Sequence, residues 1–207
     1  MSAVDASLYL VMGPDVADPV AVARAAVAGG VSLVQWRDKA GSTADQVKAV
    51  RALVDALAVP VLVNDRADVA KVAGAAGVHV GHGDLTPAQA RTIVGDEAIV
   101  GLTIHTMSEA EAADGAPIDY ASVGGVFVTT SKANSHPPIA IEGFCAIAER
   151  LRAASAVPVV AIAGIDAGRA AALSAAGADG VAVMSAITRA DDPQGAAREL
   201  REALNGR

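Results

Sequence analysis

Three polar residues at alternating positions, Gln35, Arg37 and Lys39, could together bind a diphosphate. In an extended segment, alternation puts their side chains on one side. An arginine can bind two phosphate oxygens at once, and the nearby lysine adds a second positive charge. The alternative is a solvated strand end in which Asp38 neutralises its neighbours.

Two aspartates, Asp65 and Asp84, follow two consecutive apolar runs of the chain. Carboxylate oxygens suit Mg²⁺, which keeps several waters and bridges to phosphates. Asn64, directly before the first aspartate, could orient a substrate. Asp65 alone is better explained as a turn or helix-capping residue, and Asp84 alone is equally well explained as a turn residue. The magnesium prediction therefore depends on the two carboxylates meeting.

Hydroxyl groups and a glycine follow the later apolar runs. Thr103 could hydrogen-bond a polar ligand, and His105 could act as a base or belong to a helix start. Residues 129–132 place three hydroxyls before a lysine, which is typical of an anion site and also of an ordinary surface loop. Backbone N–H groups at Gly164 and Ser185 could hold a phosphate without a positive side chain, although Gly164 is also explained by a tight turn.

Eight short apolar runs separated by alanine-rich helical segments must position these residues. The predicted strands are residues 8–12, 33–36, 61–64, 78–80, 99–103, 120–123, 159–162 and 180–183. Continuous apolar runs are typical of strands buried on both faces of a parallel sheet. Eight strand–helix units predict one α/β domain over residues 1–207, a single (β/α)8 TIM barrel, with an open doubly wound sheet as the alternative. In a barrel, the carboxyl ends of the strands meet at one rim, where chemistry takes place.

Local signals also predict where helices begin and end. Thr86 and Thr106 are each followed three residues later by a glutamine or glutamate, which predicts two capping boxes. Asp18 and Asp192 each precede a proline, a combination typical of a helix start. Gly77, between a helical run and an apolar run, predicts a left-handed helix end.

The composition excludes several classes of partner. Aromatic residues make up 2% of the 207 residues, too few for a base-stacking surface, and the net charge of −7 opposes a polyanion-binding face. We therefore expect no nucleic acid, and any phosphate must be bound by local cations and backbone N–H groups. The one cysteine, Cys145, excludes an internal disulfide and a cysteine-rich zinc site. The chain has no long apolar run and no signal-like start, so we expect a cytoplasmic protein without a membrane partner. A homo-oligomer is compatible with the sequence.

Six motifs in order along the chain resemble the thiamine-phosphate synthase family. They are Gln35-x-Arg37-x-Lys39, Val63-Asn64-Asp65, Gly77-Val78-His79-Val80-Gly81, His105-Thr106-Met107-Ser108-Glu109, Thr129-x-Ser131-Lys132 and Gly177-Ala178-Asp179-Gly180-Val181. The resemblance covers nearly the whole chain. It implies a transferase that joins 4-amino-2-methyl-5-(diphosphooxymethyl)pyrimidine to thiazole phosphate, releasing pyrophosphate and forming thiamine phosphate with Mg²⁺ as cofactor.

The resemblance also implies a role for each matching residue. The residues implied to contact the pyrimidine diphosphate are Gln35, Trp36, Arg37, Asp38, Lys39, Asn64, Thr103 and Lys132, of which Arg37, Lys39 and Lys132 are implied to be catalytic. Those implied to contact the thiazole phosphate are Thr129, Thr130, Ser131, Gly164, Met184 and Ser185. Asp65 and Asp84 are implied to hold Mg²⁺. The cations and the metal would neutralise charge on the departing diphosphate, which leaves a carbocation-like pyrimidine.

The chain departs from the family pattern at a few positions. The family usually has proline where Gly125 and Val128 stand, often glutamine at His82 and glycine at Ala163, and usually serine at Thr103. None of these changes removes a cation or a metal carboxylate.

Two alternative functions follow from the same residues. One is a thiazole tautomerase-like enzyme, in which His105 would be the acid–base catalyst without a metal; the retained cations and aspartates argue against it. The other is a non-catalytic barrel that binds phosphorylated ligands, supported by Gly125, Val128 and Ala163.

Overall fold

Eight parallel strands close into a barrel in the computed structural model, which describes residues 4–129 and 137–206. Each strand pairs with the next one along the chain, and β8 pairs with β1 to complete the ring. The strands are β1 (Leu8–Met12), β2 (Leu33–Trp36), β3 (Val61–Asn64), β4 (Gly77–Val80), β5 (Ile99–Ile104), β6 (Tyr120–Val123), β7 (Val159–Ile162) and β8 (Gly180–Val183). The predicted (β/α)8 barrel is confirmed. Strand β4 begins one residue earlier than predicted and β5 ends one residue later.

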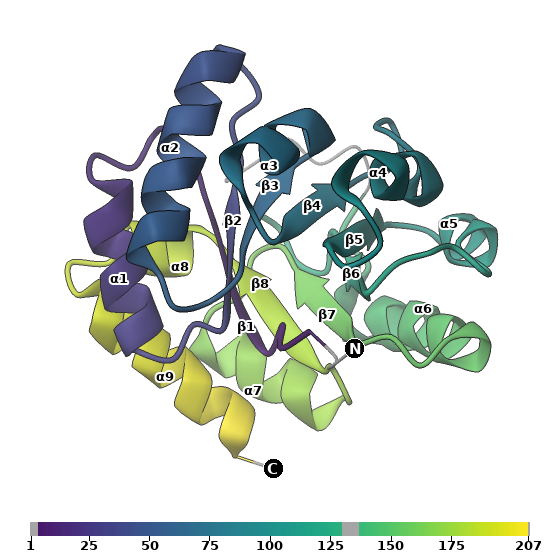
Figure 1. The fold of residues 1–207 in the computed structure, drawn as a ribbon. Helices are drawn as coiled ribbons and strands as arrows, with labels where there is room; N and C mark the ends of the chain where they lie inside the picture. Colours follow the sequence, from purple (N-terminus) through teal and green to yellow (C-terminus); the bar gives the residue numbers. More distant parts are fainter. Residues whose placement is uncertain (1–3, 130–136, 207) are drawn as a thin grey trace.

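Helices surround the strands on the outside (Figure 1). They are α1 (Pro19–Ala28), α2 (Thr43–Ala56), α3 (Ala67–Ala73), α4 (Pro87–Val94), α5 (Met107–Ala112), α6 (Ala140–Ala154), α7 (Ala167–Ala175), α8 (Ser185–Thr188) and α9 (Pro193–Asn205). Within the described parts of the chain, no helix is both long and apolar enough to cross a membrane.

Alternation along each strand divides the apolar side chains into two layers. Tyr9, Leu33 and Tyr120 belong to the smaller cluster, inside the barrel, whereas Leu10 and Val34 belong to the larger cluster, between the strands and the helices. Both faces of the strands are therefore covered, which explains why the strand sequences are continuously apolar.

All four predicted helix starts are confirmed. The side chains of Asp18, Thr86 and Asp192 accept hydrogen bonds from backbone N–H groups in the first turns of α1, α4 and α9, and Thr86 and Gln89 form the complete capping box. The second predicted box is wrong in one half. Thr106 accepts from the Glu109 backbone, but the Glu109 carboxylate accepts from the backbone N–H of His105, at 2.6 Å.

The predicted helix end at Gly77 is also wrong. Helix α3 ends earlier, at Gly74, whose φ of +74° is the left-handed cap. Gly77 lies within β4, where a side chain would overlap the backbone of Ile99 on the neighbouring strand. A glycine that permits close strand approach and one that caps a helix look alike in sequence.

Candidate active site

The carboxyl end of β3 carries the first predicted metal ligand. Asp65 adopts φ +62°, and its backbone N–H donates to the His79 carbonyl of β4 at 2.8 Å, which fixes the start of the loop. Left-handed backbone is unusual for a residue other than glycine, though aspartate tolerates it better than most. This backbone conformation begins the turn into α3.

Asp84 and Lys39 meet the Asp65 carboxylate. Lys39 donates a hydrogen bond to Asp65, and the Asp84 carboxylate lies within hydrogen-bonding reach of it. Burial is the main cause that raises the pKa of Asp65, and the negative charge of Asp84 raises the pKa further, against the effect of Lys39. Asp84 is itself held by the Gly81 backbone N–H at 2.9 Å. The structure therefore brings the two predicted metal carboxylates together, with one predicted cation beside them.

The residues at the end of β2 and in the loop after it divide into those whose side chains reach the site and those whose side chains do not. Gln35 is buried inside the barrel and donates to the Tyr9 hydroxyl, and Arg37 follows, half-buried, at the strand end. Trp36 instead packs in the apolar layer between strands and helices, so its ring faces away from the barrel interior. The Asp38 carboxylate accepts from the backbone of Ala40 and Gly41, at 2.9 and 2.7 Å. Asp38 shapes its own loop.

Polar side chains from four strands form a network inside the barrel. Tyr9 and Tyr120 join their hydroxyls at 2.9 Å, and Tyr120 contacts His79 Nδ1 at 2.7 Å. His79 Nε2 lies 2.6 Å from the Thr103 hydroxyl. Nearby, the buried Nδ2 of Asn64 has no hydrogen-bond partner in the described part of the chain. His79 is therefore a buried, hydrogen-bonded residue of the barrel interior.

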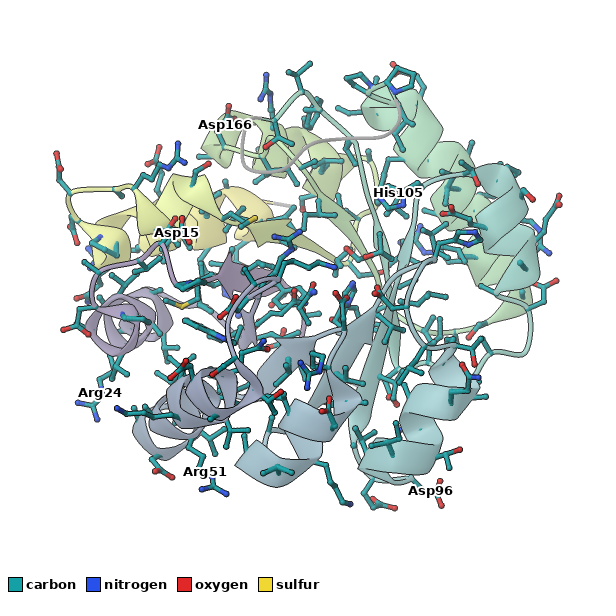
Figure 2. The ribbon with its side chains drawn as sticks, turned by 90° about the horizontal axis from the view of Figure 1, so that it is seen from above. Asp15, Arg24, Arg51, Asp96, His105 and Asp166 are labelled. Atoms are coloured by element: carbon teal, nitrogen blue, oxygen red, sulfur yellow. The ribbon has the colours of Figure 1, made fainter. Side chains whose placement is uncertain are left out.

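His105 lies at the end of β5, close to Gly124 at the end of β6. Figure 2, seen from above, places it nearer the barrel than the labelled residues of the outer helices. Its Nδ1 lies 3.6 Å from the Glu109 carboxylate, four residues later on α5. The same carboxylate accepts the backbone N–H of His105.

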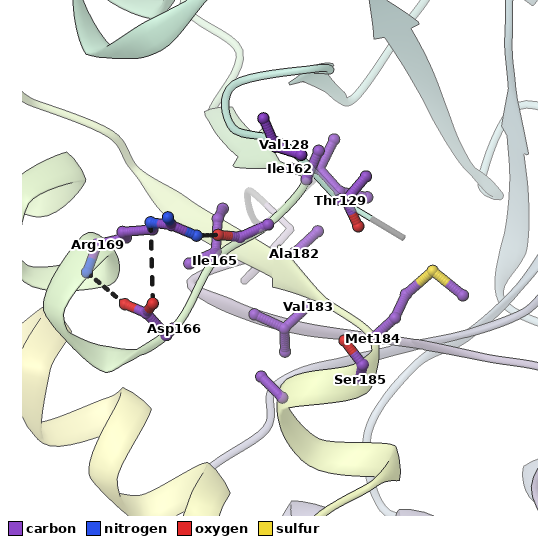
Figure 3. A pocket seen from close by; sticks show the side chains of 13 residues that line it. Val128, Thr129, Ile162, Ile165, Asp166, Arg169, Ala182, Val183, Met184 and Ser185 are labelled. Atoms are coloured by element: carbon purple, nitrogen blue, oxygen red, sulfur yellow. Dashed lines mark hydrogen bonds and ion pairs between the residues drawn. The ribbon is translucent and has the colours of Figure 1, made fainter. Parts of the chain in front are cut away.

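A cavity of about 360 Å³ opens at the ends of β7 and β8 (Figure 3). Four residues predicted to contact the thiazole phosphate line it: Thr129, Gly164, Met184 and Ser185. The other predicted residues of the loop, Thr130, Ser131 and Lys132, lie outside the described residues. The cavity is further lined by Asp166 and Arg169, which the sequence analysis did not identify. Their spacing of three residues at the start of a predicted helix was the available signal.

The turn after β7 has an unusual backbone. Ala163 has φ +98° and Gly164 has φ +66°. Glycine is required at the second position, because a side chain there would overlap the Val128 carbonyl. Ala163, where the family often has glycine, adopts a conformation that glycine populates more easily.

The sequence comparisons agree with this geometry. The family described as Thiamine monophosphate synthase matches residues 8–187. A thiamine-phosphate synthase of Agrobacterium fabrum is 46% identical over 206 residues, covering 98% of this chain and 91% of the relative. A thiamine-phosphate synthase of Chloroflexus aurantiacus is 43% identical over 190 residues, covering 89% and 85%.

Solved structures agree as well. A thiamine phosphate pyrophosphorylase from Pyrococcus furiosus superposes with a TM-score of 0.86 at 30% identity, covering 97% of this chain and 96% of that one. An orotidine 5′-phosphate decarboxylase from Pyrococcus horikoshii, at TM-score 0.71 and 17% identity, shares the fold alone. The chain therefore belongs to the thiamine monophosphate synthase family, enzymes of thiamine biosynthesis that act as transferases.

Proposed function

We propose that this enzyme joins 4-amino-2-methyl-5-(diphosphooxymethyl)pyrimidine to thiazole phosphate, forming thiamine phosphate and releasing pyrophosphate. The observation that carries the proposal is the meeting of Asp65, Asp84 and Lys39 at the same end of the barrel as the cavity of β7 and β8. The cluster of Asp65, Asp84 and Lys39 suits a diphosphate with its metal ion. The cavity at β7 and β8 suits a second phosphorylated ligand. The two substrates would thus meet above the barrel.

The thiazole phosphate would bind in the cavity at β7 and β8. Backbone N–H groups at Gly164 and Ser185, the latter at the start of α8, can bind phosphate oxygens without a cation. Thr129 adds a hydroxyl on the opposite wall, and Met184 lies beside Ser185. Such a site suits a protein whose net charge is −7. The anchor fixes the position of the thiazole ring relative to the pyrimidine.

The pyrimidine diphosphate would bind near β2, β3 and β5. Gln35, Asn64 and Thr103 would hold it by polar contacts, and Asn64 supports this role because its amide nitrogen is buried and unpaired within the described chain. Arg37, Lys39 and Lys132 would neutralise the diphosphate. A contact with Trp36 or Asp38 would have to use their backbone, given the positions of the two side chains.

The reaction needs charge stabilisation more than proton transfer. The bond between the pyrimidine methylene carbon and the diphosphate oxygen breaks, and both electrons leave with pyrophosphate. The aminopyrimidine ring donates electrons to the methylene, giving a carbocation-like centre. The thiazole nitrogen then attacks with its lone pair, so no base is required. Arg37, Lys39 and Lys132 stabilise the growing negative charge on the leaving group.

Mg²⁺ fits the carboxylate pair. Asp65 and Asp84 are adjacent, like-charged and only partly compensated by Lys39, so they would hold a cation whose charge would relieve their repulsion. Mg²⁺ is commonly bound by one or two carboxylates together with substrate phosphates, which suits a site where no cluster of three or more His, Cys, Asp or Glu side chains occurs within the described residues. When bound, the ion supplies positive charge to the diphosphate oxygens.

The test measures pyrophosphate and thiamine phosphate released from both substrates by the purified protein. We expect both products with Mg²⁺ and neither with EDTA. Replacing Arg37 by alanine should lower kcat/KM by about 100-fold, which is typical for loss of a charge-stabilising group, with little change in Tm. The matched control is Arg24→Ala, an exposed arginine on the outer face of α1 (Figure 2), which should keep full activity.

Three outcomes would contradict the proposal. Full activity of Arg37→Ala would show that Arg37 does not stabilise the diphosphate. Isomerisation of thiazole phosphate that survives EDTA, without use of the pyrimidine diphosphate, would favour the tautomerase alternative. Tight binding of both substrates without turnover would favour a non-catalytic barrel.

A further inference from the structure

The strained turn after β7 is held from outside by one arginine. Ala163 and Gly164 both have positive φ, a backbone that alanine adopts only when its surroundings enforce it. Arg169, on α7, donates from Nη1 to the Gly164 carbonyl at 2.5 Å. Figure 3 shows Arg169 beside Asp166 at one end of the cavity.

Arg169 also connects the turn to two neighbouring elements. Its guanidinium lies over the Phe127 ring, 4.8 Å from the ring centre, which ties it to the loop after β6. Its Nε lies 3.8 Å from the Asp166 carboxylate, which also accepts from the Arg169 backbone and caps α7. The side chain is thus fixed from three directions.

Two hydrogen bonds then define both peptide groups of the turn. The Ala163 carbonyl accepts from the Phe127 backbone N–H at 3.2 Å, and the Gly164 carbonyl accepts from Arg169. In a planar trans peptide, the N–H points opposite to the carbonyl. The N–H of Ile165, which shares its peptide with the Gly164 carbonyl, is therefore directed away from Arg169. The N–H of Gly164 is fixed in the same manner by Phe127.

We infer that Arg169 is a positioning residue that holds the 163–165 turn in the form that presents its backbone N–H groups to the thiazole phosphate. The inference rests on the proposed function of this cavity. Arg169 acts through the turn, because its Nη1 donates to the Gly164 carbonyl and its guanidinium lies over the Phe127 ring. It lies with the negatively charged Asp166 at the end of the cavity opposite Met184 and Ser185 (Figure 3).

The first measurement compares the effect of Arg169→Ala on the KM values of the two substrates. In Arg169→Ala, the KM for thiazole phosphate should rise about tenfold, the loss expected for about one charge-assisted hydrogen bond. The KM for the pyrimidine diphosphate and kcat should change little. An equal rise in both KM values, or a fall in kcat alone, would overturn the inference.

Arg152→Ala is the matched control. Arg152 donates to the carbonyl of Gly177, which also has positive φ, at 2.6 Å and pairs with Asp179 at 2.8 Å. This arginine braces the turn before β8, at the amino end of the strands, so its loss should lower stability without raising either KM. A selective rise in the thiazole phosphate KM of Arg152→Ala would overturn the inference.

A double variant tests the link to backbone strain. Glycine at position 163 favours the turn conformation by itself, so Arg169→Ala should raise the thiazole phosphate KM less in an Ala163→Gly background than in the parent. Equal effects in the two backgrounds would contradict the bracing role.

The last measurement needs no substrate and is independent of the proposed function. Hydrogen exchange of the Phe127 amide, observed by NMR, reports whether the turn stays closed on the loop after β6. Exchange of this amide should be faster in Arg169→Ala than in the parent protein. It should be slower in the double variant Ala163→Gly/Arg169→Ala than in Arg169→Ala. Unchanged exchange in Arg169→Ala would overturn the inference, whereas absence of thiamine phosphate in the parent protein would overturn only the proposed function.

Discussion

At the scale of single residues, Asp65 combines an unfavourable charge with a position in the candidate site. Its side chain is 18% exposed and faces Asp84. Its backbone is in the left-handed region. The raised pKa means that ionised Asp65 destabilises the folded state of the metal-free protein at neutral pH. Residues that bind charged ligands often carry such a cost in the free protein.

Asp65→Asn should therefore stabilise the metal-free protein while removing most of its activity. Asparagine keeps the shape and also tolerates left-handed backbone, so the main change is loss of the charge. We expect a higher Tm in EDTA near neutral pH, measured by calorimetry. As a control, Asp68→Asn removes an exposed carboxylate whose pKa is lowered by its hydrogen bonds with Arg66, and it should lower Tm slightly or leave it unchanged.

The pH dependence has a definite sign. The folded-state pKa of Asp65 lies above its ordinary value of 3.8. As the pH falls, the folded state therefore takes up a proton on Asp65 before the unfolded state does. This uptake raises the stability of the metal-free protein as the pH falls through the folded pKa towards 3.8. Asp65→Asn should lack this contribution, so the Tm difference between the two proteins should shrink as the pH falls. A constant difference would contradict the assignment.

At the scale of elements, the interior of the barrel depends on a glycine facing a large ring. Gly101 of β5 lies opposite Tyr120 of β6, and these two residues are paired in register. A side chain at position 101 would overlap the Tyr120 ring, which is fully buried and hydrogen-bonded to Tyr9 and His79. The polar network inside the barrel thus requires a strand with no side chain at this point.

Gly101→Ala should destabilise the protein by about 1–3 kcal/mol, the usual cost of overpacking a core. Urea unfolding measures this loss as a lower midpoint. Gly83→Ala is the control, since no atom lies within 4 Å of the added methyl group, and it should change stability by less than about 0.5 kcal/mol. Equal stability of Gly101→Ala and the parent would show that the ring can move aside.

At the scale of the whole molecule, the ring of strands is closed by β8 on β1 and covered there by the last helix. Helix α9 packs against both α1 and α7 (Figure 1), joining the start and the end of the chain. Leu200 of α9 is 2% exposed in the outer apolar layer. Closure of the barrel therefore depends on a helix that carries none of the predicted site residues.

Leu200→Ala should lower the free energy of unfolding by about 2–4 kcal/mol through lost burial and a new cavity. The measurement is urea unfolding together with the KM of each substrate. Both KM values should stay near those of the parent, because Leu200 does not line the cavity at β7 and β8. Glu202→Ala, an exposed position on the same helix, should leave the unfolding curve unchanged.

The sequence by itself determined the eight strands, their order and the end of the barrel at which the candidate site residues lie. Apolar runs and capping residues predict local structure, because the patterns of strands and helices involve residues that are close together in the chain. The order of the motifs also identified the family. Arg37 and Asp65 became candidates in this way, because each directly follows an apolar run.

Only the tertiary structure decided which side chains meet. Asp65, Asp84 and Lys39 come from three separate loops, and the pairing of β3 with both β2 and β4 brings these loops together. Pairing in the barrel likewise turned the Trp36 ring outward and placed Arg169 over the turn at Gly164. These contacts depend on strand register and twist, which join residues far apart in the chain and leave no local pattern in the sequence.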